Sequence, residues 1–146
     1  MNCQDVMTPA PVCCVPDDVV VDVARLMRAQ DIGSIPVVAD HESKRLLGML
    51  TDRDLAVRVI AEGRDPRETA VRDVMSMQPV TCLATDVYQQ ALQAMGEHQV
   101  RRIPVVDAQG RLVGIIAQAD VATRLAQPST TGAVVEAISE PAASAR

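Results

Sequence analysis

The chain repeats itself, and this internal repeat constrains the fold more than any other feature of the sequence. Asp5-Val6-Met7-Thr8 returns 68 positions later as Asp73-Val74-Met75-Ser76. At the same interval, Ile35-Pro36-Val37-Val38 returns as Ile103-Pro104-Val105-Val106. In the second half of each copy the interval falls to 66 positions. The change lies within the polar residues 40–44, which are typical of a surface turn, where insertions are tolerated. The sequence therefore predicts two copies of one structural unit.

Each copy predicts the same order of elements, β-α-β-β-α. Residues 20–27 and 88–95 carry apolar side chains at helical spacing. A helix over 52–61, stopped by Gly63, closes the first copy, and one that runs through Leu125 closes the second. Short strands are expected at 11–15, 35–38, 46–50, 79–83, 103–106 and 112–116. The predicted class is α/β, with the repeats packed about a pseudo-twofold axis, because about 60 residues alone bury too little surface. Such packing would leave two related clefts where the repeats meet.

Helix-capping residues and prolines set the expected boundaries between the domains of the chain. Residues 1–64 form the first repeat, 65–127 a linking helix with the second repeat, and 128–146 a short C-terminal helix with a frayed tail. The linking helix is expected because Asp65-Pro66-Arg67-Glu68 places an Asp cap before a first-turn Pro and Glu. For the helices inside the repeats, the side chains expected to cap the N-terminus are Asp17 or Asp18 and Thr85 or Asp86.

Composition narrows the choice of partner and compartment. The 146 residues carry a net charge of −5 and no basic run, which disfavours nucleic acid. No apolar run approaches the roughly 20 residues that span a bilayer, and the N-terminus lacks a signal-peptide pattern, so no membrane partner and a cytoplasmic location are expected. The 4 cysteines and 2 histidines form no metal-ligand spacing. The cysteines are therefore expected to be small, mostly buried apolar residues, with a redox pair as the alternative.

The repeated motifs resemble those of the cystathionine-β-synthase (CBS) domain family, and the chain resembles a tandem CBS pair, also called a Bateman module. The motifs are D-V-M-T/S, x-I-P-V-V and the ending G-x-x-T-x-x-D, which the first copy matches fully from Gly48 to Asp54. In the second copy, from Gly114 to Asp120, Ala117 replaces the threonine. The resemblance covers about residues 5 to 127. Its details are most similar to the small stand-alone bacterial pairs of the hypoxic-response type.

The resemblance implies a regulatory function and a ligand. Such pairs bind AMP, ADP, ATP, NAD or S-adenosylmethionine in their clefts, commonly dimerise, and regulate an attached or separate partner. It implies that Asp54 and Asp120 bind ribose hydroxyls and that Thr51 binds a phosphate. It also implies that aliphatic strand residues hold the base, namely Ile35, Pro36, Val37, Ile103, Pro104 and Val105. The alternative for Thr51 and Asp54 is purely structural, because T-x-x-D also forms a capping box at a helix start.

The residues that precede the two x-I-P-V-V strands differ. Arg101 and Arg102 stand where the first copy has Gly33 and Ser34. Adjacent guanidinium groups suit phosphate oxygens, whereas Gly33 and Ser34 offer backbone and hydroxyl contacts. The alternative for the arginines is a solvated basic spot paired with surface carboxylates. We therefore expect the two clefts to differ in affinity.

Catalysis has no support in the sequence, since no Rossmann, P-loop, zinc-protease or nucleophile motif is present. The predicted function is a non-enzymatic regulatory module that senses an adenosine nucleotide, needs no cofactor, and signals to an unknown regulated protein or within its own homodimer. That homodimer is expected to use the C-terminal helix over 132–138. The alternative function is an interaction module with degenerate clefts, tuned by cysteine oxidation.

Overall fold

The computed structural model describes residues 1–120, which divide into two compact units. One unit consists of Val12–Pro79. The other combines Met1–Pro11 with the chain from Val80 onward. The compact units are thus cut differently from the sequence repeats, because the first eleven residues belong with the second copy.

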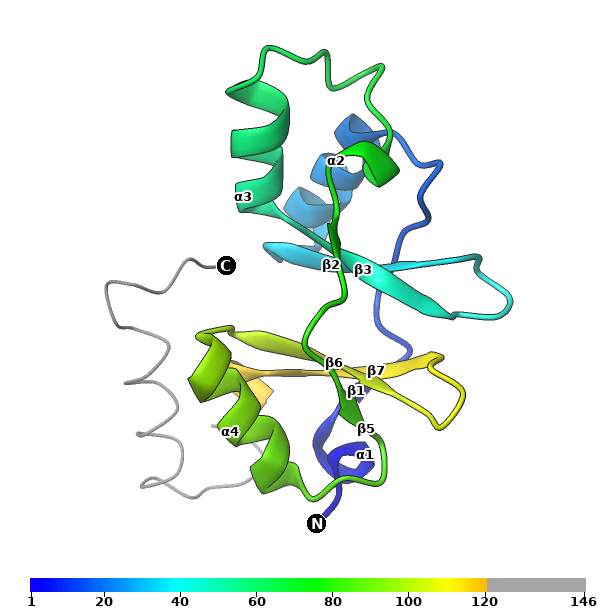
Figure 1. Ribbon diagram of the computed structural model, residues 1–146, viewed down its shortest axis with the longest axis vertical. Helices are drawn as coiled ribbons and strands as arrows, with labels where there is room; N and C mark the ends of the chain where they lie inside the picture. Colours follow the sequence, from blue (N-terminus) through cyan, green and yellow to red (C-terminus); the bar gives the residue numbers. More distant parts are fainter. Residues whose placement is uncertain (121–146) are drawn as a thin grey trace. The chain divides into compact units, whose positions relative to one another are not determined.

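The unit Val12–Pro79 is a three-stranded antiparallel sheet with helices on one face (Figure 1). The strand order is β2-β3-β4, and Ile35 lies opposite Leu50 in the central pairing. Cys14 adds a parallel bridge to Val37. The elements are α2 (Val20–Gln30), β2 (Ser34–Val38), β3 (Leu46–Thr51), α3 (Asp52–Asp54), which continues as the π-helix η1 (Leu55–Ile60), the 3-10 helix η2 (Val71–Asp73), and β4 (Ser76–Met77).

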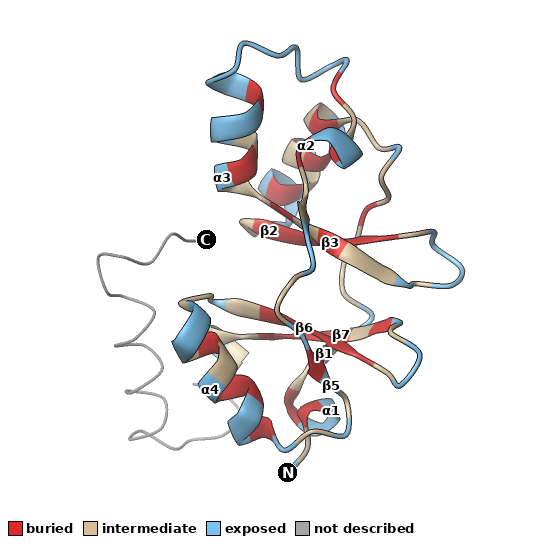
Figure 2. Cartoon of the chain, in the orientation of Figure 1, coloured by how far each residue is buried: buried red, intermediate tan, exposed pale blue. Residues whose placement is uncertain are grey.

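The unit built from Met1–Pro11 and the chain from Val80 contains a four-stranded sheet of order β1-β7-β6-β5. Its β5–β6 pairing is parallel, with Cys82 opposite Val105, and so repeats the Cys14–Val37 bridge. The elements are α1 (Cys3–Val6), β1 (Thr8–Pro9), β5 (Cys82–Leu83), α4 (Tyr88–His98), β6 (Arg102–Val106) and β7 (Leu112–Ala117). Each unit has its own apolar core, visible as the buried faces of α2 and α4 and of the strands (Figure 2).

The leading segment of each sequence copy pairs with the other copy. Thr8 of β1 lies opposite Ile115 of β7, and Ser76 of β4 lies opposite Met49 of β3. We call Met7–Pro9 and Ser76–Met77 the exchanged segments, because each pairs with a strand of the other sequence copy. A glycine lies beneath each exchanged segment. A Cβ at Gly48 would overlap the carbonyl oxygen of Ser76, and a Cβ at Gly114 would overlap the side chain of Met7. At both motif glycines, the exchanged segment therefore approaches too closely for a side chain without rearrangement.

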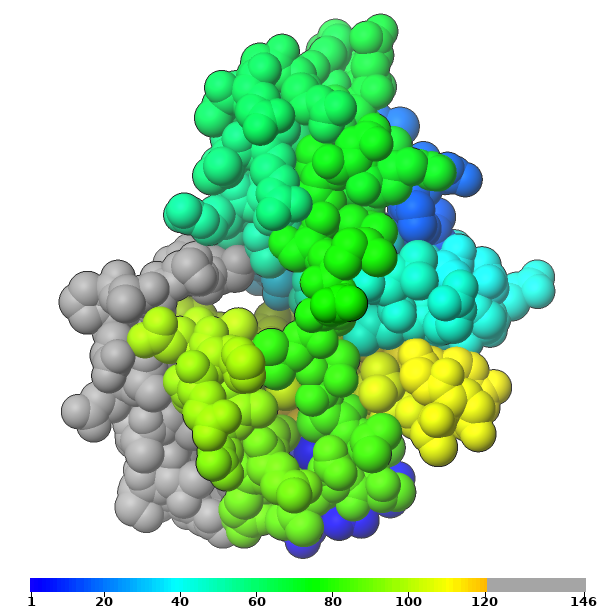
Figure 3. All heavy atoms as spheres, viewed as in Figure 1, coloured from blue at the N-terminus to red at the C-terminus, as the bar shows by residue number. Residues whose placement is uncertain are grey.

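The α/β class is confirmed, and β2, β3, β6 and β7 each lie within one residue of the predicted ranges. The strand predicted at 11–15 is wrong, since only Cys14 forms an isolated bridge there, and the strand predicted at 79–83 is reduced to Cys82–Leu83. Both segments begin with a proline, which has no N–H to donate to a neighbouring strand. The helix that closes the first copy is also confirmed, although most of it has π geometry, and it ends before Gly63, whose φ is +70°. The segment from α3 to this turn lies at the surface of its unit (Figure 3).

Two predictions about helix ends are wrong. The N-cap positions are Val19 and Val87, and neither helix has a side-chain cap. Asp18 and Asp86 accept instead from backbone N–H groups three positions earlier, at 3.0 and 2.8 Å, and so close the preceding turns. The aspartates expected to cap the helices thus stabilise the turns that precede these helices.

The linking helix predicted at Asp65 is also wrong. Residues 66–68 form a single turn, in which the Glu68 N–H donates to the Asp65 carbonyl oxygen at 3.0 Å. Beyond it the chain becomes extended, since Thr69 accepts from the Val20 N–H at 2.9 Å and Ala70 bridges to Val19. Pairing of Thr69 and Ala70 with the start of α2 therefore prevents the helix that the local sequence favours.

The expected helix that closes the second copy, the C-terminal helix over 132–138 and the tail lie outside the described residues. None of the helices within residues 1–120 is long and apolar enough to cross a membrane.

Candidate functional site

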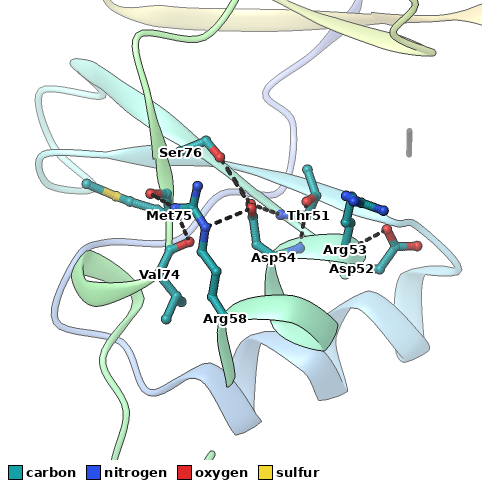
Figure 4. Close-up of polar contacts among 8 residues, drawn as sticks. All are labelled: Thr51, Asp52, Arg53, Asp54, Arg58, Val74, Met75 and Ser76. Atoms are coloured by element: carbon teal, nitrogen blue, oxygen red, sulfur yellow. Dashed lines mark hydrogen bonds and ion pairs between the residues drawn. The ribbon is translucent and has the colours of Figure 1, made fainter. Parts of the chain in front are cut away.

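The helix start after β3 is a complete capping box. The Thr51 hydroxyl accepts from the Asp54 N–H at 3.1 Å, and the Asp54 carboxylate accepts from the Thr51 N–H at 3.0 Å. Both contacts are drawn in Figure 4. The structural role of the T-x-x-D pair is therefore realised, and it leaves Asp54 only 8% exposed. Asp54 is one of three buried polar or charged side chains in the described part of the chain.

Two further groups of the same unit contact the Asp54 carboxylate (Figure 4). The Ser76 hydroxyl lies 3.3 and 3.4 Å from its two oxygens, and Arg58 Nε lies 3.8 Å from Oδ1. The same guanidinium donates to the carbonyl oxygens of Val74 and Met75, at 3.2 and 3.1 Å. Asp54 and Arg58 thus connect the helix start to the segment that leads into β4.

The second unit repeats this arrangement with fewer contacts. The Asp120 carboxylate accepts from the Ala117 N–H at 3.2 Å and from the Thr8 hydroxyl at 3.3 Å. Thr8 and Ser76 occupy equivalent positions of the repeat. Ala117 has no hydroxyl to return a cap, and Asp120 is more exposed than Asp54. Both units therefore share the backbone N–H donor and the hydroxyl–aspartate pair, and differ in the returning hydroxyl of the capping box.

The loop before each x-I-P-V-V strand meets the helix start through one backbone hydrogen bond. Asp52 N–H donates to the Gly33 carbonyl oxygen at 2.8 Å, and Gln118 N–H donates to the Arg101 carbonyl oxygen at 2.9 Å. A Cβ at Gly33 would lie 2.8 Å from Asp52 Oδ2, so the first unit has a carboxylate beside its loop. The second unit has Gln118, an uncharged residue, at the position equivalent to Asp52.

The charged side chains of the second loop differ in burial. Arg101 is exposed, and Arg102 is half-buried at the first position of β6. Burial lowers the pKa of Arg102, and the nearby charge of Asp120 acts in the opposite direction. The guanidinium stays charged at neutral pH. Arg102 lies near the charge of Asp120 and is paired with Ala117 across β6 and β7. In the other unit the equivalent strand pair is Ser34 with Thr51.

The candidate base-holding residues are buried in both units. Ile35 and Val37 are in the core of one unit, and Ile103 and Val105 are in the core of the other. Side chains alternate along a strand, so Pro36 and Pro104 point to the opposite face. Pro36 and Pro104 are therefore the members of this set that point away from these cores.

Three residues that contact the aspartates were missed by sequence reasoning: Ser76, Thr8 and Arg58. The D-V-M-T/S motif held the signal for the first two, because a hydroxyl stands at its fourth position in both copies. Arg58 lies one turn after Asp54, a spacing that is typical of an ion pair on a helix. Nothing in the spacing pointed to its contacts with Val74 and Met75.

A CBS domain family model matches residues 3–60 and again residues 71–127. The chain belongs to the CBS domain family. The two matches correspond to the two sequence copies, so the resemblance to a tandem CBS pair is confirmed. Stand-alone CBS pairs are in general regulatory modules without catalytic activity of their own.

Similar proteins include CBS pairs of comparable length. The CBS domain-containing protein YhcV of Bacillus subtilis is 40% identical over 136 residues, which covers 93% of this chain and 94% of YhcV. Hypoxic response protein 1 of Mycobacterium tuberculosis is 37% identical over 122 residues, or 84% of this chain and 83% of that protein. The crystal structure of CBSX2 from Arabidopsis thaliana in complex with AMP has a TM-score of 0.74 and 26% identity, and covers 88% of this chain and 98% of CBSX2.

One related structure carries metal. Hypoxic Response Protein I with two coordinated zinc ions has a TM-score of 0.76 and 35% identity, and covers 85% of this chain and 98% of that one. Within residues 1–120 of the present chain, no group of three or more His, Cys, Asp or Glu side chains could hold a metal ion. The described residues therefore do not fit a zinc site built from such a group.

Proposed function

We propose that this CBS pair is a non-catalytic regulatory module that binds an adenosine nucleotide, of the AMP, ADP, ATP, NAD or S-adenosylmethionine class. The observation that carries the proposal is the carboxylate that each unit holds at the same helix start, at Asp54 and at Asp120. A ribose diol needs an acceptor for two O–H groups, and an ionised carboxylate offers that capacity. The AMP complex of the related CBSX2 supports the class of ligand.

The roles proposed for the other residues follow their chemistry. In the first unit, Asp54 accepts the ribose hydroxyls, Thr51 contacts a phosphate, and Gly33 and Ser34 supply backbone and hydroxyl contacts. In the second unit, Asp120 accepts the ribose hydroxyls, and Arg101 and Arg102 hold phosphate oxygens. The base lies against aliphatic strand residues, with Pro36 and Pro104 the best placed of the set.

The asymmetry in charge predicts different ligand preferences for the two units. Asp52 lies beside Gly33, whereas Gln118 lies beside Arg101. A phosphate near the first loop meets a negative side chain, and a phosphate near the second meets two guanidinium groups. The second unit should therefore favour di- and triphosphates, and the first should favour ligands with less negative charge.

The hydroxyl–aspartate pairs offer a route for signalling. A ribose diol that donates to Asp54 competes with the Ser76 hydroxyl, which lies at the start of β4, three positions before Pro79 ends this unit. In the same way, a ligand on Asp120 competes with Thr8 of β1. Occupancy thus acts on the exchanged segments, provided that the ligand binds the two arrangements with different affinity. The receiver is a regulated protein or the second chain of a homodimer.

A second candidate function is an interaction module with degenerate clefts. It is favoured by the contacts of Asp54, since the Thr51 N–H, the Ser76 hydroxyl and Arg58 already lie against its carboxylate. A carboxylate that already accepts hydrogen bonds from its own chain has fewer lone pairs available for a ligand.

A thermal-shift panel of AMP, ADP, ATP, NAD and S-adenosylmethionine separates the two functions. A ligand at 100 times its dissociation constant adds about 2.7 kcal/mol to the free energy of unfolding. We expect a rise in Tm with at least one nucleotide and a smaller rise in the Asp54→Asn and Asp120→Asn variants. No rise with any nucleotide at millimolar concentration would favour the interaction module.

A further inference from the structure

Cys3 and Cys82 lie far apart in the sequence but in one apolar core. The backbone holds Cys3 against the chain just after β5. Its N–H donates to the carbonyl oxygen of Asp86 at 2.8 Å, and the neighbouring Gln4 N–H donates to that of Ala84 at 3.0 Å. Cys82 is the first residue of β5. The N-terminal segment is therefore fixed beside the strand that carries the second cysteine.

The two thiols are buried in the same core and close enough to influence each other. Cys3 is 0% and Cys82 6% exposed. The Cys82 sulfur lies 3.9 Å from the carbonyl oxygen of Pro104. The interaction with Cys82 lowers the pKa of Cys3, whereas the same interaction and burial raise the pKa of Cys82. Cys3 is thus the member of the pair that loses its proton first, and a thiolate is the nucleophilic form.

We propose that Cys3 and Cys82 form a reversible disulfide, which fastens Met1–Pro11 covalently to the unit that begins at Val80. With hydrogen peroxide as oxidant, the Cys3 thiolate attacks one peroxide oxygen, the O–O bond breaks, and the leaving hydroxide takes up a proton. The Cys82 sulfur, losing its proton, then attacks the sulfenic sulfur of Cys3, and the S–O bond breaks with release of water. Two thiols and one peroxide give one disulfide and two waters, and the sulfurs lose two electrons.

Access to the pair comes through the N-terminal segment. Cys3 lies in α1, a helix of 4 residues, and the following strand β1 has 2 residues. Elements this short open at a lower free-energy cost than a long core strand. Opening of this segment exposes Cys3 to a small oxidant without unfolding the unit.

The other unit contains the same site with one thiol missing. Cys14 is the repeat equivalent of Cys82, and Val71 is the equivalent of Cys3. The Val71 N–H donates to the Asp18 carbonyl oxygen at 2.8 Å, as the Cys3 N–H does to Asp86, and both residues are buried in their unit's core. Because Val71 is buried at the position equivalent to Cys3, valine fits there, and the Cys3→Val variant should fold. In this arrangement Val71 takes the place of the second thiol, and burial raises the pKa of Cys14 to about 12.

Peptide mapping of the full chain tests the proposal directly. The protein is treated with hydrogen peroxide, alkylated under denaturing conditions without reductant, digested and analysed by mass spectrometry. We expect a peptide that joins Cys3 to Cys82, and a fall in free thiols from the 4 in the sequence to about 2. Dithiothreitol should restore all of them. Finding Cys3 and Cys82 both alkylated after such treatment would overturn the proposal.

Matched variants separate this disulfide from oxidation elsewhere. Cys13 is half-buried and lies in the other unit, so Cys13→Ser should keep the cross-link, while Cys3→Val should lose it. Val71→Cys should create a second cross-link, to Cys14. The oxidised wild type should melt about 5–10 °C above the reduced form, because the disulfide closes a long loop. A rise of equal size in Cys3→Val would contradict the assignment. The outcome does not depend on nucleotide binding.

Discussion

Asp54 and Asp120 occupy the same place in two copies of one motif, yet their surroundings differ. Asp54 caps a helix jointly with Thr51, is 8% exposed, and contacts Ser76 and Arg58. Asp120 follows Ala117, which provides no hydroxyl; its carboxylate accepts from the Ala117 N–H and the Thr8 hydroxyl and lies near the charge of Arg102. The capping box cannot be the whole reason for the aspartate, because the aspartate remains where the box is incomplete. What both units retain is a carboxylate paired with a hydroxyl from the exchanged segment.

The largest expected effect is on nucleotide affinity at the more enclosed aspartate. If Asp54 accepts both ribose hydroxyls, Asp54→Ala should weaken binding by about 30- to 1,000-fold, or about 2–4 kcal/mol. Asp54→Asn keeps the size of the side chain but removes its charge, and we expect it to weaken binding more than Asp120→Asn. Calorimetric titration of the three proteins measures the difference. Unchanged nucleotide affinity in folded variants would show that Asp54 serves only as a helix-capping residue.

The glycines beneath the exchanged segments should differ in tolerance. A Cβ at Gly48 meets backbone of β4, whereas a Cβ at Gly114 meets side-chain atoms of Met7 from Cβ to Sδ. We expect Gly48→Ala to lower the free energy of unfolding by about 1–3 kcal/mol and Gly114→Ala by less, because Met7 can change rotamer. Chemical denaturation of both variants checks this order. Equal losses would mean that the two crossings are equally rigid.

The loop arginines sharpen the comparison of charge. Arg102→Gln should lower affinity for ATP by about tenfold, or about 1.4 kcal/mol, and leave affinity for adenosine almost unchanged. Ser34 holds the equivalent position in the first unit, so Ser34→Ala is the control and should not discriminate between ATP and adenosine. Competition titrations with both ligands measure the ratio. A parallel loss for adenosine would argue against a phosphate role.

The capping residues can be exchanged between the units. Thr51→Ala should destabilise the protein by about 1 kcal/mol, and Ala117→Thr should stabilise it by a similar or smaller amount. Both changes alter one hydroxyl at the same motif position. Thermal unfolding of both variants gives the values. A stabilising effect of Thr51→Ala would show that the capping contacts drawn in Figure 4 do not operate in solution.

Periodicity predicted β2, β3, β6 and β7 well because each I-P-V-V run is buried along its whole length. Helix starts were harder, since Asp18 and Asp86 can bind the turn before the helix as readily as the helix itself. The linking turn at Asp65 failed as a helix because Thr69 and Ala70 pair with the start of α2, which no local window contains.

The candidate site was predicted in its motif residues but not in their partners. Thr51 and Asp54 are three positions apart, so the sequence contains their contact. Ser76 reaches Asp54 across 22 positions, and Thr8 reaches Asp120 across 112. Contacts at such separations follow from the exchange of segments, and a repeat alignment alone does not reveal the exchange.

The exchange also sets an order in which the chain can assemble during synthesis. Every strand of the unit Val12–Pro79 has its partner once Met77 has been made. The β1 strand, although made first, waits for Gly114 and Ile115 before it can pair. Loop closure over so many residues is slow compared with pairing of neighbouring strands. A ribosome that stalls midway therefore carries one assembled unit with an unpaired N-terminal strand, which is a site for capture by chaperones or proteases.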